Sequence, residues 1–319
     1  MQPALAPAAE GRMDWRILIA DKLEAAGVER LRSHAEVVES NDLSAIDSYD
    51  ALIVRGATQV DRAVMAAGRP RLRVVGRSGV GVDNIDTGAA AELGVTVVNA
   101  PLATTNAVAE HALALMLALA RSIPQADASM KAGAWEKKGM KGTELDGKRL
   151  GVIGLGRIGA SLAAKAAALG MDVVGHDPPL DPAEILRRGA RPVSLDELLS
   201  TSDFVSLHVP LDDTTRGLLG PEELAAAKPG LRLISTARGG VVDEEALLAG
   251  LETGHIAGAA LDVFRREPPG ATPLVLHPHV IATPHLGAQT HEAQQRAATD
   301  IADEVLAALS GAELRWRIP

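Results

Sequence analysis

Three ionisable side chains in the last third of the chain are of the types that proton transfer requires. Arg238 lies in S-T-A-R-G-G, Glu267 in R-R-E-P-P and His285 in A-T-P-H-L-G-A, and a short apolar run precedes each segment. A guanidinium binds a carboxylate through two parallel hydrogen bonds. An imidazole can take or give a proton near neutral pH, and a nearby carboxylate favours its protonated form. The three residues therefore predict acid–base chemistry on a small carboxylic acid.

Each of these residues also has a structural interpretation. Arg238 precedes two glycines and is compatible with a surface turn. Glu267 precedes two prolines and is compatible with a solvated loop, and His285 follows a proline where it could cap a loop. Their joint occurrence after successive apolar, strand-like runs favours the catalytic interpretation.

A glycine pattern upstream predicts the cofactor. Gly154, Gly156 and Gly159 form G-x-G-x-x-G between an apolar, strand-like run and an alanine-rich run with helical spacing. The glycines permit a tight turn, close approach of a pyrophosphate and close packing of helix on strand, and the helix N-terminus attracts the phosphates. Asp177 closes the next apolar run, where it would accept hydrogen bonds from the adenosine ribose and repel a 2′-phosphate. The glycines alone are a weak signal, but strand, helix and acid in this order predict NAD as the cofactor.

Two series of short apolar strands alternating with helices position these residues. The first series has strands at 15–20, 35–39, 51–55, 71–76 and 95–99, and the second has strands near 153, 174, 205, 233, 260 and 281. A long helix over about 106–121 and a polar, glycine-interrupted excursion at 122–148 lie between the two series, and a final helix spans about 290–309. Alternating strands and helices predict parallel sheets with right-handed crossovers, and ligands then bind beyond the carboxyl ends of the strands.

We therefore expect an α/β protein with two doubly wound parallel-sheet domains. Residues 101–288 would form a Rossmann NAD-binding domain, inserted into a flavodoxin-like substrate domain made of residues 13–100 and 289–319. Residues 1–12 would be a flexible tail, with Met13 as an alternative start. Hinges would lie near Ala100 and Leu286, and the domains would close around their ligands.

Composition narrows the class of protein. The chain has 319 residues, a net charge of −9 and no cysteine. The lack of cysteine excludes disulfides and thiolate zinc sites and is typical of a reducing compartment, so we expect a cytoplasmic protein. Nucleic acids require basic clusters and membrane spans require longer apolar runs, so we expect neither partner. His277 and His279 lack an accompanying acid cluster, so we expect no metal site.

The motifs resemble those of the NAD-dependent D-2-hydroxyacid dehydrogenase family from Trp15 onward. The resemblance is carried by G-L-G-R-I-G, T-A-R-G-G-V-V-D-E, A-A-L-D-V-F and E-P-P followed by P-H-L-G-A. It implies that Arg238 binds substrate, that His285 is the acid–base and that Glu267 pairs with it. Further cofactor contacts implied by the family are Arg157, Ile158, Val209, Thr236, Ala237, Asp262, Gly287 and Ala288.

Two loops of the first series resemble those of the phosphoglycerate dehydrogenase branch. L-I-V-R-G-A-T-Q-V places Arg55 and Gly56, and G-R-S-G-V-G-V-D-N-I-D places Arg77, Val80 and Gly81. The resemblance implies that the two arginines attract a phosphorylated substrate, with help from Lys137 of the partner subunit. Extra cations suit a substrate that carries a carboxylate and a phosphate.

The chain also departs from that branch at three points. It ends at Pro319, so we expect neither a C-terminal regulatory domain nor serine feedback through one. Gly56 stands where a serine is common, which removes one hydroxyl. Val209 stands where some relatives have threonine, which leaves only backbone contacts to the cofactor there.

The resulting hypothesis is NAD-dependent oxidation of D-3-phosphoglycerate to 3-phosphohydroxypyruvate, the first step of serine biosynthesis. A glyoxylate or hydroxypyruvate reductase, or another D-2-hydroxyacid dehydrogenase, would need the same three catalytic residues without the phosphate-binding arginines. A corepressor-type, NAD-sensing binding protein would share the fold. We expect a homodimer, or a tetramer, acting on a small anionic 2-hydroxy or 2-keto acid.

Overall fold

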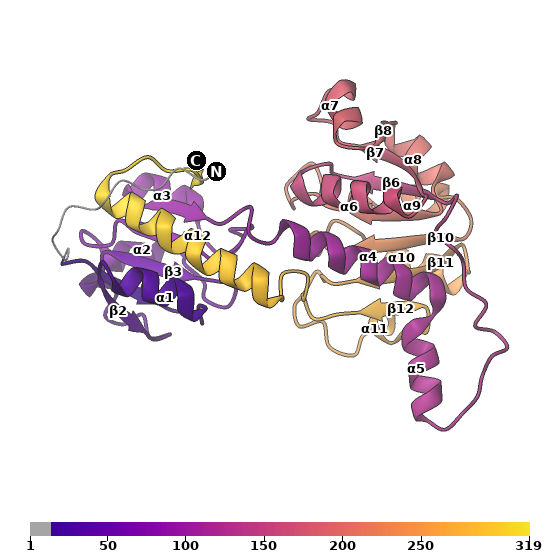
Figure 1. Ribbon diagram of the computed structural model, residues 1–319, viewed down its shortest axis with the longest axis horizontal. Helices are drawn as coiled ribbons and strands as arrows, with labels where there is room; N and C mark the ends of the chain where they lie inside the picture. Colours follow the sequence, from indigo (N-terminus) through magenta and orange to yellow (C-terminus); the bar gives the residue numbers. More distant parts are fainter. Residues whose placement is uncertain (1–13) are drawn as a thin grey trace. The chain divides into compact units, whose positions relative to one another are not determined.

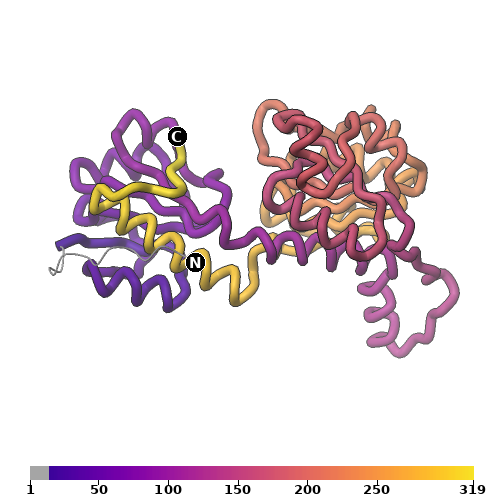
Figure 2. The backbone as a smooth tube through the Cα atoms, turned by 45° about the horizontal axis from the view of Figure 1, so that its top comes forward, coloured from indigo at the N-terminus to yellow at the C-terminus, as the bar shows by residue number. Residues whose placement is uncertain are grey.

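The chain forms two compact units in a computed structural model that describes residues 14–319 (Figures 1 and 2). Among the described residues, unit 1 comprises Asp14–Thr104 together with Gln289–Pro319, and unit 2 comprises Thr105–Ala288. The tail expected at residues 1–12 and the alternative start at Met13 lie outside the described residues. Each unit is built around one sheet.

The sheet of unit 1 has the strand order β13-β5-β4-β3-β1-β2. From β5 to β2 the strands are parallel and follow the flavodoxin-like order 2-1-3-4-5, read from the other edge. The strands are β1 (Arg16–Ile19), β2 (Glu36–Glu39), β3 (Ala51–Val54), β4 (Val74–Arg77), β5 (Thr96–Asn99) and β13 (Arg317–Ile318). The fold class is therefore confirmed. The sequence did not predict β13, a two-residue edge strand that pairs antiparallel with β5.

Helices cover both faces of this sheet. α1 (Ala25–Arg32) and α12 (His291–Ser310) lie side by side on one face, and η1 (Ile46–Ser48), α2 (Arg62–Gly68) and α3 (Thr87–Leu93) belong to the other (Figure 1). Ile301 and Val305 of α12 are fully buried over β4. A side chain at Gly76 would place its Cβ 2.6 Å from Val305, so the missing side chain is what lets the last long helix settle onto this sheet.

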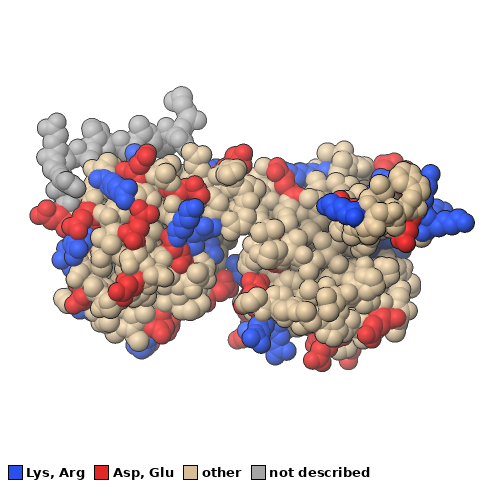
Figure 3. All heavy atoms as spheres, turned by 90° about the horizontal axis from the view of Figure 1, so that it is seen from below, with Lys and Arg blue, Asp and Glu red and all other residues tan. Residues whose placement is uncertain are grey.

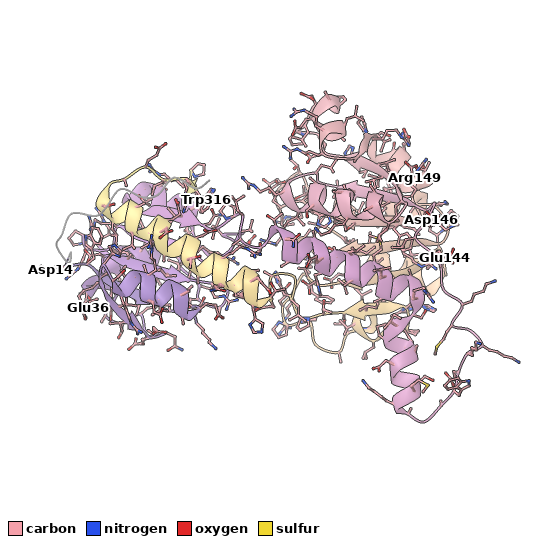
Figure 4. All side chains as sticks on the ribbon, in the orientation of Figure 1. Asp14, Glu36, Glu144, Asp146, Arg149 and Trp316 are labelled. Carbon is pink, nitrogen blue, oxygen red and sulfur yellow. The ribbon has the colours of Figure 1, made fainter. Side chains whose placement is uncertain are left out.

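A buried carboxylate attaches the final strand to α12. Glu304 is 1% exposed and accepts hydrogen bonds from Arg315 Nε at 2.7 Å and from the backbone N–H groups of Arg315 and Trp316. Trp316 is labelled in Figure 4. A buried carboxylate is costly unless it is paired and hydrogen-bonded, so Glu304 specifies where the chain turns back towards β13.

The sheet of unit 2 has the strand order β12-β11-β10-β9-β6-β7-β8, and all its pairs are parallel. Counted from β6, this is the Rossmann order 3-2-1-4-5-6 with one further strand. The strands are β6 (Arg149–Ile153), β7 (Asp172–His176), β8 (Arg191–Pro192), β9 (Phe204–Leu207), β10 (Leu231–Ser235), β11 (Ile256–Leu261) and β12 (Val280–Ala282). Both faces of this sheet are buried, which explains why its strands are almost continuously apolar.

Two apolar layers enclose this sheet, one on each face. The helices are α4 (Thr105–Arg121), α5 (Ile123–Lys131), α6 (Arg157–Ala168), α7 (Pro182–Arg187), α8 (Leu195–Thr201), α9 (Pro221–Ala226), α10 (Glu244–Glu252) and α11 (Pro273–Leu276). α4 and α6 contribute to one layer, and α8, α9 and α10 contribute to the other. The polar excursion expected at 122–148 contains α5, a helix that its composition did not predict. None of the residues of α5 is buried, and Trp135 beyond it is 80% exposed.

The surface carries both signs of charge. On the face shown in Figure 3, acidic and basic side chains are interspersed on each unit. In the described part of the chain no single helix is long and apolar enough to cross a membrane. Thr105–Ala120 and Ile123–Lys131 meet the length and composition test only as a pair, bent by 64°.

Candidate active site

The three candidate catalytic residues follow three neighbouring parallel strands of unit 2. Arg238 follows β10, Glu267 follows β11 and His285 follows β12, so all three loops leave the same edge of the sheet. His285 Nδ1 lies 2.8 Å from Glu267 Oε2. This contact engages Nδ1 and fixes the orientation of the imidazole. Nε2 is then the nitrogen that could exchange a proton with a ligand.

The pairing shifts both pKa values in opposite directions. The hydrogen bond that the His285 imidazole donates to the Glu267 carboxylate raises the pKa of His285 above its ordinary value, although burial acts against this. Burial acts to raise the pKa of Glu267, but the hydrogen bonds from His285 and from the backbone N–H of Phe264 outweigh it and lower that pKa. The pair therefore favours imidazolium beside carboxylate, as the chemistry of an acid–base catalyst requires.

Arg238 is brought towards the Glu267 loop by the glycine that follows it. A Cβ on Gly239 would lie 1.9 Å from the carbonyl oxygen of Phe264, so the two loops touch through their backbones. Arg238 Nη1 donates to the carbonyl of Ala237 at 2.7 Å. Glu244 accepts from the backbone N–H of Arg265 at 2.6 Å and fastens the Glu267 loop to the start of α10. Glu244 is thus a supporting residue that the sequence did not single out.

His285 has a left-handed backbone, with φ of 53°. For a residue other than glycine this conformation costs of order 1–3 kcal/mol and persists only when the surroundings enforce it. Asp262 supplies that enforcement: its carbonyl accepts from His285 N, and its carboxylate accepts from the N–H groups of Leu286 and Gly287 at 2.7 and 2.8 Å. Asp262 therefore shapes the turn that presents the imidazole, and its expected contact with the cofactor stays a prediction.

Two further side chains bind the Asp262 carboxylate, and sequence reasoning assigned neither of them to the site. Thr283 Oγ1 donates to Oδ1 at 2.5 Å, and His111 Nε2 lies 3.2 Å from the same oxygen. Burial acts to raise the pKa of Asp262, but the hydrogen bonds from these two residues and from the turn lower it. The only sequence signal for His111 was a polar residue inside an apolar helix.

The glycine loop has the form that a pyrophosphate site needs. Gly154 has φ of 86°, and a Cβ there would lie 2.8 Å from the carbonyl oxygen of His208. A Cβ on Gly159 would lie 2.0 Å from the carbonyl oxygen of Gly154, so α6 packs directly against the turn. Apart from its own chain neighbours, no described residue has an atom within 4 Å of the Cβ position of Gly156, and the N-cap of α6 has no side-chain hydrogen bond. The backbone is therefore open to a phosphate at the point to which the helix N–H groups are directed.

Two charged residues hold the middle residue of this loop. Asp177 Oδ2 accepts from Leu155 N at 2.7 Å, and Arg188 Nη1 donates to Leu155 O at 2.6 Å. Both backbone polar groups of Leu155 are thus held by protein side chains. Asp177 was expected near the ribose, whereas nothing in the sequence pattern indicated Arg188.

The other expected cofactor residues also lie at carboxyl ends of strands. Arg157 and Ile158 begin α6, Val209 lies beyond β9, and Thr236 and Ala237 follow β10. Thr236 Oγ1 is buried and has no hydrogen-bond partner among residues 14–319, so its hydroxyl could serve a bound group. His208 is partly buried, and its Nε2 lies 2.9 Å from Ser206 Oγ. Burial lowers its pKa to about 4, so this imidazole is neutral near pH 7. The last two expected contacts, Gly287 and Ala288, end the His285 turn.

In unit 1, the two arginine loops meet at one sheet edge. Arg77 ends β4 and pairs in register with Val54, so Arg55 follows directly on the neighbouring strand. Asp21 organises the Arg55 loop, accepting from Arg55 N at 2.6 Å and from Thr58 Oγ1 at 2.7 Å. Asn84 joins the two loops by donating to the carbonyls of Arg55 and Thr58. Asp21 and Asn84 are supporting residues that the sequence analysis did not identify.

Glycines shape these loops. Gly79 has φ of 146°, and its Cβ position would lie 1.5 Å from Arg77 Nη1, so the guanidinium lies over the space of the missing side chain. No described atom lies within 4 Å of the Cβ position of Gly56. Val80 accepts a hydrogen bond from Asn99 Nδ2 at 2.6 Å and precedes Gly81. These contacts position the backbone that carries Arg77.

Lys137 belongs to unit 2 and is exposed, in the segment between α5 and β6. Its contribution was expected from the partner subunit and stays a prediction. Among residues 14–319 no three His, Asp or Glu side chains gather as a metal site would need.

The family described as "D-isomer specific 2-hydroxyacid dehydrogenase, NAD binding domain" matches residues 113–287. D-3-phosphoglycerate dehydrogenase 2, chloroplastic, of Arabidopsis thaliana is 50% identical over 93% of this chain and 49% of its own length. D-3-phosphoglycerate dehydrogenase of Mycobacterium leprae is 48% identical over 92% of this chain and 57% of its own length. The chain thus spans about half the length of the curated relatives it matches.

Solved structures share the whole fold. A glyoxylate reductase from Paecilomyes thermophila superimposes with a TM-score of 0.88 at 32% identity, over 96% of this chain and 98% of that one. The TT0316 protein from Thermus thermophilus gives a TM-score of 0.88 at 36% identity, over 95% of this chain and 100% of that one.

Proposed function

The chain belongs to the D-isomer specific 2-hydroxyacid dehydrogenase family, and from this premise we propose that it oxidises D-3-phosphoglycerate to 3-phosphohydroxypyruvate with NAD. The observation that carries the choice of substrate is the pair Arg55 and Arg77, at the ends of adjacent strands of unit 1. Two cations beside each other suit a substrate with a phosphate in addition to its carboxylate. Curated relatives that are 44% to 50% identical to this chain are D-3-phosphoglycerate dehydrogenases, which supports the same substrate.

Unit 2 would bind the cofactor. The uncapped N-terminus of α6 and the open backbone at Gly156 would hold the pyrophosphate, and Asp177 would accept hydrogen bonds from the adenosine ribose. Thr236 and Ala237 would line the nicotinamide end. When bound, the nicotinamide supplies the hydride acceptor, and the chain supplies position and proton transfer.

His285 would act as the acid–base. Its Nδ1 is engaged by Glu267, so Nε2 would take the proton from the substrate hydroxyl as the C2 hydride leaves. Glu267 would stabilise the imidazolium that forms, and Arg238 would hold the substrate carboxylate. In the reverse reduction the same imidazolium would return its proton to the carbonyl oxygen.

Unit 1 would provide the phosphate-binding charge through Arg55 and Arg77, and Lys137 of the partner subunit would add a third cation. This assignment includes a homodimer, which the exposed α5 and Trp135 support because exposed apolar groups favour an interface. The division into a substrate domain and an NAD-binding domain, and a cytoplasmic location, stay predictions.

Steady-state assays of the pure protein test the substrate. We expect 3-phosphohydroxypyruvate to be reduced with a kcat/KM well above that for glyoxylate or hydroxypyruvate, and NADH to be preferred over NADPH. Comparable turnover of glyoxylate would favour the second candidate, a glyoxylate reductase, to which the structural similarity to the Paecilomyes thermophila enzyme points.

Arg77→Ala separates these two candidates. It should lower kcat/KM for the phosphorylated substrate much more than for glyoxylate. Only the phosphorylated substrate has a phosphate that Arg77 would bind. An equal loss for both substrates would show that Arg77 does not recognise the phosphate.

A further inference from the structure

The Asp262 carboxylate is the centre of a buried network beside the catalytic pair. It is 1% exposed and accepts hydrogen bonds from Thr283, Leu286 and Gly287. These donors lie on both sides of His285, so the carboxylate closes the turn that carries the imidazole. His111, on α4, approaches the same carboxylate from a different element.

His111 contacts this network through one ring nitrogen, and its helix is anchored in the core of unit 2. Its Nε2 lies 3.2 Å from Asp262 Oδ1 and 3.3 Å from Thr283 Oγ1, so it contacts two of the groups that shape the turn. The next turns of α4 bury Leu115, Met116 and Leu119 in the apolar layer of unit 2, which fixes the helix against the sheet.

α4 also contacts the turn directly. A Cβ on Gly287 would lie 3.4 Å from a methyl group of Val108 and 3.2 Å from Asp262 Oδ2. The turn is therefore confined between the buried carboxylate and the helix, and His111 is the polar connection between the two.

We propose that His111 is a positioning residue for the dehydrogenase reaction, acting through Asp262 and Thr283 to hold His285 in its left-handed backbone and in line with Glu267. The proposal rests on the catalytic role proposed above for His285. Its chemical basis is that a buried carboxylate keeps one geometry only while all its donors are present. Loss of the His111 donor removes one of the two side chains that bind Asp262 Oδ1 and loosens the turn at its strained residue.

The test compares two substitutions at one position. His111→Gln keeps an N–H donor, whereas His111→Leu keeps an apolar body without one. We expect His111→Leu to lower kcat by about 10- to 100-fold, as the loss of a residue that orients a site group typically does. KM and the Kd of NADH should change little, and His111→Gln should restore most of kcat.

A pH profile distinguishes positioning from a general loss of packing. The groups that face His285 are Glu267 and Asp262, which raise its pKa, and Arg238, which lowers it. If His111→Leu misaligns His285 from Glu267, the pKa of His285 falls, and the decline in keto-acid reduction at high pH begins at lower pH. His111→Gln should keep the wild-type profile.

Two control variants distinguish a loss of positioning from a loss of folding, and the choice of assay substrate makes the result independent of the substrate proposed above. Glu110→Gln changes an exposed neighbour on α4 and should behave as wild type. Thr283→Val removes the other side-chain donor to Asp262 and should reproduce the kcat loss if His111→Leu does not fold. All rates are measured with whichever keto acid the wild type reduces best, so failure of 3-phosphohydroxypyruvate as substrate leaves this test intact. Wild-type kcat and pH profile in His111→Leu, or an equally impaired His111→Gln, would overturn the proposal.

Discussion

Replacing Gly156 with alanine should separate cofactor binding from stability. Gly156 has φ of −62° and ψ of −164°, an extended conformation open to alanine, and apart from its chain neighbours no described residue has an atom within 4 Å of its Cβ position. The added methyl group therefore meets no atom of the described chain. Since alanine has fewer conformations in the unfolded chain, the free energy of unfolding should stay the same or rise by about 0.4–1 kcal/mol.

The same methyl group should weaken NADH binding. It would stand where the pyrophosphate is proposed to approach the N–H groups of α6, so it would lengthen hydrogen bonds made to a charged group. Such bonds are worth about 1.5–3 kcal/mol, and losing one corresponds to an increase in Kd of roughly 10- to 100-fold.

Two measurements on the same sample check this prediction. NADH titration followed by cofactor fluorescence gives Kd, and urea unfolding gives the free energy of unfolding. Gly88→Ala in α3 is the matched control: the same substitution at a site in unit 1, where the Cβ has only Asp86 Oδ1 at 3.5 Å among described atoms, should leave Kd unchanged. Gly159→Ala is the opposite case, because its Cβ would lie 2.0 Å from the Gly154 carbonyl oxygen and should destabilise the fold. Wild-type affinity for NADH in Gly156→Ala would refute the proposed position of the pyrophosphate.

Three further predictions concern other charged groups. Glu267→Gln removes the hydrogen-bonded charge that raises the pKa of His285, so keto-acid reduction, which needs imidazolium, should decline from a lower pH than in the wild type; an unchanged pH–rate profile would contradict the pairing. Asp177→Ser should raise KM for NADH, because the ribose and the Leu155 N–H lose their acceptor, and should increase the NADPH to NADH ratio of kcat/KM; a fixed ratio in the assay would exclude Asp177 from cofactor choice. Glu304→Ala should lower the free energy of unfolding by about 1.5–3 kcal/mol, because the backbone N–H groups of residues 315 and 316 lose their charged acceptor; urea unfolding with a loss below about 1 kcal/mol would show that Glu304 does not anchor β13.

The sequence predicted the features that repeat at regular spacing. The apolar runs indicated both strand series, and the order of strand, glycine turn, helix and acid identified the NAD fold; the family, the cofactor and the fold class are confirmed. The sequence also predicted that the loops after β10, β11 and β12 carry the candidate catalytic residues, because the carboxyl ends of parallel strands meet at one edge of the sheet.

The supporting contacts could not be predicted in this way. His111 approaches Asp262 from a distant part of the sequence, and no periodic pattern indicates which buried carboxylate a helix histidine will meet. Arg188 contacts Leu155 through a bend after α7 that has no characteristic spacing. The antiparallel β13 depends on the buried side chain of Glu304, which in the sequence looks like one more polar residue of an amphipathic helix.

The discontinuity of unit 1 has a consequence for its biosynthesis. The residues that fill one face of its sheet belong to α12, which the ribosome makes only after all of unit 2 has been synthesised. Domains generally fold as units during synthesis, so unit 2 can complete its sheet while β1 to β5 still lack their covering helix. During that interval the apolar face that later receives Ile301 and Val305 is exposed, and the emerging chain is most open to aggregation or chaperone binding at that stage.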